Sequence, residues 1–246
     1  VENYRPGVMD KLGLGYDELK KVNPRIIYAA VSGFGCYGPN SQRPGYDIIA
    51  QAVGGLMSIS GHPGGQPTRV GSASGMATGR KESIVTLEVG VLLRDLLLAE
   101  GATVVMTRDT QKTFVGMLER ADIPNNAGAD FVLRLHCNSG IQVYCPSDSS
   151  YAREVADMDT YRTMGNTLLS AIKTATGQTR GDCTLNNSYV GNNWSKMPSF
   201  LVEMGYMTSQ EEDYLLSTPV YQQWLAQGMV EGVVQLAQLR GLIDKQ

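Results

Sequence analysis

The hydrophobic pattern of this chain changes in character near residue 80. From that point Ile84, Leu87 and Val91 recur at the spacing of one helix face, and further leucines widen the apolar stripe. Gly101 follows the last leucine-rich turn, where a glycine commonly ends a helix. The pattern therefore predicts a long, largely buried helix over residues 82–100.

Beyond this helix, short apolar runs alternate with stretches of helical periodicity. The apolar runs predict strands at residues 102–107, 131–135, 141–144 and 200–202. The periodic stretches predict helices at residues 113–121, with Thr113 as the cap, and at 158–176 and 219–240, and Pro124 is expected to break or kink the first of them. This alternation predicts an α/β domain with a mainly parallel sheet and helices on both faces.

The first 79 residues have a different texture, rich in glycine and proline. Helices are predicted to begin near Val8 and near Asp17, and Pro24 should stop the second. Residues 26–32 predict a buried strand, and residues 48–57 predict a helix, alone or followed by a strand. This part of the chain therefore predicts short elements joined by loops.

Composition narrows the possible partners of the chain. It has 246 residues and a net charge of −3 with scattered lysine and arginine, which argues against a nucleic-acid partner. No apolar run approaches the ~20 residues that span a bilayer. The chain begins with Val1, and no signal peptide is visible. Its four cysteines form no CxxC pair, so reduced thiols are expected.

Three residues at the ends or starts of these elements have side chains suited to metal-assisted hydrolysis. His136, one of only two histidines, ends an apolar run, and Glu203 follows another. Glu82 stands in the first turn of the long predicted helix. Catalytic zinc favours such imidazole and carboxylate ligands, although His136 alone would also suit a hydrogen-bonded core and Glu82 would also favour the helix dipole. Cys137 should face away from His136 into the core, because adjacent strand residues point in opposite directions.

Residues 1–71 resemble the family III CoA transferases. The resemblance is carried by short segments in that family's order, at residues 2–7, 23–28, 32–35, 43–47 and 61–71. The family's acyl-carrying aspartate follows a glycine shortly after the last segment, whereas residues 75–79 contain no acid. Because transfer through a mixed anhydride needs that carboxylate as nucleophile, we expect no CoA transfer from this part.

From about residue 70 onward, the chain resembles the zinc-dependent N-acetylmuramoyl-L-alanine amidases of bacterial cell walls, spores and phage lysins. The matching segments are residues 81–82, 104–108, 119–120, 126–130, 135–138, 193–198, 201–207 and 211–213. The resemblance implies that Zn²⁺ is bound by Glu82 and His136, and that Glu203 is the catalytic acid and base. It implies hydrolysis of the amide between N-acetylmuramic acid and L-alanine in peptidoglycan, and an extracellular or cell-wall location.

One departure from the amidase pattern leaves the function open. The family's first metal histidine stands in an Asp-x-Gly-His segment that this chain lacks, and His62 is the only other imidazole. His62 is either the third metal ligand or a loop residue of the transferase-like part. We predict two domains, residues 1–79 and 80–246. The hypotheses are a zinc amidase, a catalytically inactive chimera and, less favoured, a CoA-transferase-related protein without its catalytic aspartate.

Overall fold

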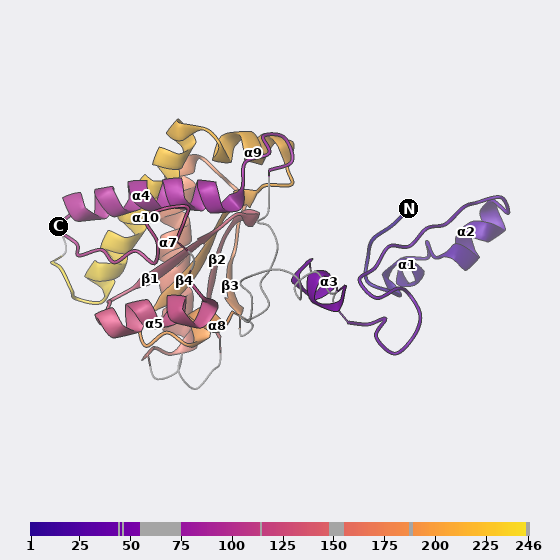
Figure 1. The fold of residues 1–246 in the computed structure, drawn as a ribbon, viewed down its shortest axis with the longest axis horizontal. Helices are drawn as coiled ribbons and strands as arrows, with labels where there is room; N and C mark the ends of the chain where they lie inside the picture. Colours follow the sequence, from indigo (N-terminus) through magenta and orange to yellow (C-terminus); the bar gives the residue numbers. More distant parts are fainter. Residues whose placement is uncertain are drawn as a thin grey trace. The chain divides into compact units, whose positions relative to one another are not determined.

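The computed structural model describes residues 1–43, 45, 47–54, 75–113, 115–147, 155–186 and 189–244. The chain separates into two compact units, Val1–Gly71 and Ser72–Gln246. Both are traced in Figure 1. The domain boundary that we place after residue 79 stays a prediction.

The first unit contains three short helices: α1 (Val8–Lys11), α2 (Tyr16–Val22) and α3 (Asp47–Val53). They confirm the helices predicted at these places. The strand predicted over residues 26–32 was wrong, because the only pairing described there is an isolated bridge between Glu2 and Ala30. Ile27 is 91% exposed, so this segment is not the buried strand that the sequence predicts. Indeed, Gly15 is the only described residue of 1–54 that is buried, and it has no side chain to form a core.

This lack of buried side chains predicts that the first unit is cleaved first by a protease. A segment without a packed core opens at little cost in free energy, and proteolysis follows the population of opened chain. Brief digestion of the full chain, followed by mass spectrometry, should show early cuts within residues 1–54. Cuts that accumulate equally within the long helices of the second unit would contradict the prediction.

The second unit is built around three long helices that confirm the predicted ones: α4 (Glu82–Ala99), α7 (Met158–Thr176) and α10 (Pro219–Leu239). The side chain of Asp157 caps α7 by accepting from the N–H of Thr160 at 2.7 Å. The shorter helices are α5 (Met117–Ala127), α8 (Val190–Asn193) and α9 (Gln210–Leu216). Within the part of the chain that the structure describes, no helix has the length and apolar surface for a membrane span.

Four strands form one sheet: β1 (Val132–His136), β2 (Asn138–Pro146), β3 (Cys183–Asn186) and β4 (Ser199–Tyr206). Their order is β1-β4-β2-β3. The pairs β1–β4 and β2–β3 are parallel, and β2–β4 is antiparallel. The sheet is therefore mostly parallel, as the sequence predicts.

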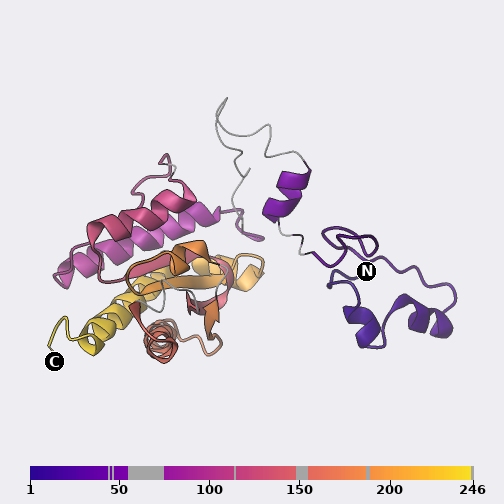
Figure 2. The same ribbon diagram turned by 90° about the horizontal axis from the view of Figure 1, so that it is seen from below.

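Helices cover the two faces of this sheet, which confirms the predicted α/β architecture. One face carries the main core, where Phe200, Val202 and Met204 of β4 are fully buried. There α7 packs on β2 and β3, while α10 packs on α7 and α4. The opposite face meets α8, which also contacts α5. Figure 2 shows α7 and α5 on opposite sides of the sheet.

Several details of the second unit differ from the sequence prediction, which did not include β3, α8 or α9. Residues 102–107 run without strand pairing among the described residues, because an apolar run becomes a strand only beside a partner. Helix α5 begins after Gly116 rather than at Thr113, and it continues past Pro124 to Ala127. A residue outside the helix stabilises its last turn, because the N–H of Lys196 donates to Oδ1 of Asn125 at 2.9 Å.

Candidate active site

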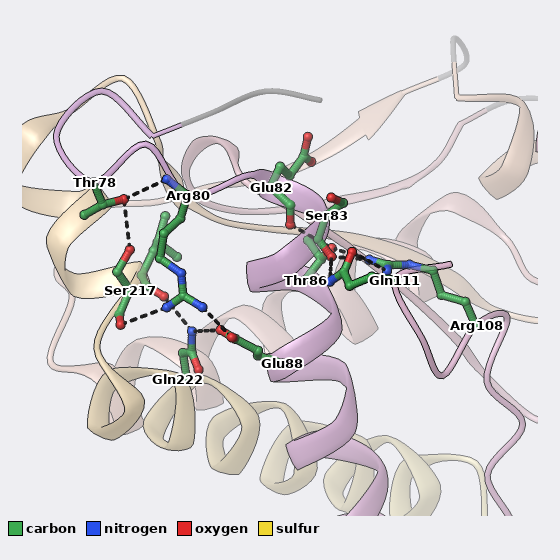
Figure 3. A network of polar contacts seen from close by, with 11 residues as sticks. Thr78, Arg80, Glu82, Ser83, Thr86, Glu88, Arg108, Gln111, Ser217 and Gln222 are labelled. Carbon is green, nitrogen blue, oxygen red and sulfur yellow. Dashed lines mark hydrogen bonds and ion pairs between the residues drawn. The ribbon is translucent and has the colours of Figure 1, made fainter. Parts of the chain in front are cut away.

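Glu82 and His136 meet where α4 begins and β1 ends. Nδ1 of His136 lies 3.0 Å from Oε1 of Glu82. The same carboxylate oxygen accepts from the backbone N–H of Cys137 at 3.2 Å. Glu82 stands in the first turn of α4, as Figure 3 shows. The start of one element and the end of another thus bring two predicted metal ligands into contact.

The strand register places Glu203 beside this pair. Glu203 is the partner of His136 across the parallel β1–β4 pair and the partner of Gln142 across β4–β2. Side chains at paired positions share one face of a sheet, with Cβ atoms ~4.5–5.5 Å apart. Glu203 lies inside β4 rather than after a short strand, and it is only 5% exposed. Glu82, His136 and Glu203 therefore gather at one end of β1.

Cys137 lies against this cluster but belongs to the core, as the sequence predicts. Its side chain is 1% exposed and packs in the main hydrophobic cluster. Burial raises the pKa of the Cys137 thiol, and the negative charges of Glu82 and Glu203 raise it further. The Cys137 side chain is therefore part of the core.

The contact between Glu82 and His136 suits a shared zinc ion. Bonds of ~2 Å arranged tetrahedrally place two ligand atoms ~3.3 Å apart, close to the observed 3.0 Å. Among the described residues, no group of three or more His, Cys, Asp or Glu could hold a metal. His62, the third predicted ligand, lies outside the described residues, so its role stays a prediction.

The buried carboxylate of Asp213 hydrogen-bonds the loop that precedes Glu82. Asp213 of α9 is 0% exposed. Its Oδ2 accepts from the N–H groups of Ala77 at 2.9 Å and Thr78 at 2.7 Å, and its Oδ1 accepts from the Thr78 hydroxyl at 3.0 Å. A Cβ on Gly75 would lie 1.9 Å from Oδ1, so only glycine allows this close approach. Asp213 therefore fixes the segment just before the first predicted ligand.

Two polar clusters extend this support along the first turns of α4 (Figure 3). In one, Arg80 pairs with Glu88 and donates to the carbonyl of Ser217 at 3.2 Å. In the other, the side chain of Gln111 donates to the carbonyl of Ser83 at 2.9 Å. The start of α4 is thus held from both sides, which restricts the position of Glu82.

Replacing Asp213 by alanine should lower the free energy of unfolding of the second unit by ~3 kcal/mol. The substitution leaves the partly buried N–H groups of Ala77 and Thr78 without their acceptor. Urea titration followed by circular dichroism measures the change. The control is Asp95→Ala, because Asp95 is a 58% exposed side chain on α4. A loss of stability for Asp213→Ala no larger than that of the control would contradict the role of Asp213 in holding the segment before Glu82.

Sequence reasoning missed two side chains of this sheet face. Gln142 is paired with Glu203, and Arg134 precedes His136 by two positions in β1. The signal for Arg134 was present: residues two apart in a strand share a face. Gln142 carries no such signal, because its neighbour is set by the register between β2 and β4.

Comparison with known proteins identifies the second unit. The N-acetylmuramoyl-L-alanine amidase family model matches residues 58–235, and the chain belongs to this family. Amidase AmiC2 of Nostoc punctiforme is 27% identical with a TM-score of 0.58, and the match covers 68% of this chain and 89% of that chain. An amidase from Clostridium difficile 630 is 25% identical with a TM-score of 0.59, covering 69% and 89%.

The first unit matches a different family. Residues 1–79 match the CoA-transferase family III model. Acetyl-CoA:oxalate CoA-transferase of Acetobacter aceti is 59% identical over 74 residues, which are 30% of this chain and 19% of that protein. Human succinyl-CoA:glutarate CoA-transferase is 50% identical over 80 residues, which are 32% and 18%. The chain thus spans less than a fifth of the length of these curated relatives. Both resemblances that the sequence predicts are confirmed.

Proposed function

We propose that the chain is a zinc-dependent hydrolase that cleaves the amide between N-acetylmuramic acid and L-alanine in peptidoglycan. The observation that carries the proposal is the meeting of Glu82, His136 and Glu203 at one end of β1. Membership of the amidase family supports it. The substrate places the working protein in the cell wall.

In this proposal Glu82 and His136 would hold a zinc ion. When bound, zinc lowers the pKa of a water molecule and polarises the scissile carbonyl. The Glu203 carboxylate takes a proton from the attacking water and returns it to the leaving nitrogen of L-alanine. Its position beside His136 on the same sheet face suits this transfer, and its burial keeps bulk water from competing.

Catalytic zinc sites favour three protein ligands and one water. His62 is the remaining histidine of the chain, and it is the third ligand in this proposal. The competing hypothesis is an inactive chimera, in which His62 is only a loop residue of the transferase-like part. In either case residues 1–79 form a transferase-derived domain without its catalytic carboxylate, so no CoA transfer is proposed.

The full chain decides between the two hypotheses through its metal content and its activity. Purified protein should contain about one zinc per chain and release dye from labelled peptidoglycan. A chelator should remove both the metal and the activity, and added zinc should restore both. Protein that stays free of zinc after incubation with it, and releases no dye, would support the chimera instead.

A further inference from the structure

Arg134 is a partly buried cation on the same sheet face as the candidate active site. It lies in β1, paired with Leu201 of β4, two residues along the strand from the pair formed by His136 and Glu203. Among the described residues, no ion pair or hydrogen bond joins the Arg134 guanidinium to a carboxylate. This is unusual, because a cation withdrawn from water without a partner lowers stability.

The surroundings of Arg134 add positive charge rather than neutralising it. A Cβ on Gly191 would lie 2.0 Å from Nη1 of Arg134, so the guanidinium packs directly against the backbone of α8. Burial lowers the pKa of Arg134, and the positive charge of Arg120 on α5 lowers it further. The guanidinium nevertheless stays charged. The sheet face that meets α8 thus carries the Arg134 cation with the positive charge of Arg120 near it, which favours an anion.

We propose that Arg134, assisted by Arg120, binds a peptide carboxylate carried by the second residue beyond the scissile amide. The inference rests on the proposed function and names a specificity determinant for it. Two strand positions separate Arg134 from His136, which is ~7 Å. An extended peptide advances ~3.3–3.6 Å per residue, so a carboxylate two residues on lies at that distance. A guanidinium binds a carboxylate through two parallel hydrogen bonds.

Two dipeptides that differ in a single group test this assignment. The γ-methylamide of L-alanyl-D-glutamate carries a free α-carboxylate, and the γ-methylamide of L-alanyl-D-isoglutamine carries an uncharged α-amide in its place. Titration of the full chain with each, followed by NMR chemical shifts, gives the two dissociation constants. The wild-type chain should bind the acid at least about 10-fold more tightly than the amide. Equal affinities, or no binding of either dipeptide, would overturn the proposal.

Matched variants assign the preference to Arg134. Arg134→Gln should bind the two dipeptides equally, and Arg134→Lys should keep part of the preference because it keeps the charge. Arg94→Gln is the control, because Arg94 is a partly buried arginine already paired with Asp95. The melting temperature of Arg134→Gln should be unchanged or raised, since the guanidinium has no acid partner to lose among the described residues. A preference that survives in Arg134→Gln would assign it elsewhere and overturn the proposal.

The dipeptide titration can fail independently of the proposed hydrolysis. If the wild-type chain releases dye from peptidoglycan but does not distinguish the dipeptides, the carboxylate site is wrong and the amidase function stands. If it distinguishes the dipeptides but releases no dye under zinc-replete conditions, the carboxylate site stands as a binding site and the hydrolytic function is wrong.

Discussion

Glu203→Gln is expected to lower the release of dye from labelled peptidoglycan by about 10²-fold or more, while zinc binding is retained. Glutamine keeps the size of the side chain and removes its ability to accept and return a proton. Because Glu203 is only 5% exposed inside β4, bulk water is a poor substitute for it. Initial rates of the variant and the wild-type chain at equal zinc content give the ratio.

A change at an exposed acid separates this effect from a general loss of carboxylate. Glu211 is exposed in the first turn of α9, and Glu211→Gln should leave the rate of dye release unchanged. Retention of zinc by Glu203→Gln shows that the ligands are intact. A fully active Glu203→Gln chain would falsify the assignment of this residue as the acid and base.

The sequence was sufficient to predict the two residues that meet at the end of β1. Glu82 begins a helix with a clear apolar stripe, and His136 ends a short apolar run, so both positions follow from local pattern. Their contact at 3.0 Å depends on the fold, and the family resemblance anticipated it. The burial of Glu203 was also foreseeable, although the length of β4 was not.

The failures concern segments whose structure depends on a partner. Residues 26–32 and 102–107 both have strand composition, yet neither pairs as a strand among the described residues. A run of β-branched residues favours the extended conformation of a strand. A strand forms only where a neighbouring strand supplies the hydrogen bonds of the ladder. Residues 26–32 lie in the segment that matches the CoA-transferase model and residues 102–107 in the amidase match, so the failure is not confined to one part of the chain.

The support around Glu82 was equally invisible in the sequence. Asp213 lies more than a hundred residues from Thr78, and only the fold brings its carboxylate to the backbone of that loop. Arg134 illustrates the opposite case. The sequence was sufficient to predict that Arg134 and His136 share one face of a strand. That Arg134 has no acid partner among the described residues could be seen only in the structure.

His136→Ala is expected to lose zinc and activity together. It removes an imidazole that contacts Glu82, so the proposed site loses one of its three ligands. Even changes to groups that only orient metal ligands weaken binding ~10–100-fold, so loss of a ligand should weaken zinc binding by at least ~100-fold. Competition with a fluorescent zinc chelator measures that affinity. The same measurement on His62→Ala tests the third ligand: equal loss supports His62 as a ligand, and full zinc binding would assign it to a loop. A His136→Ala chain with the wild-type affinity for zinc would contradict the metal site itself.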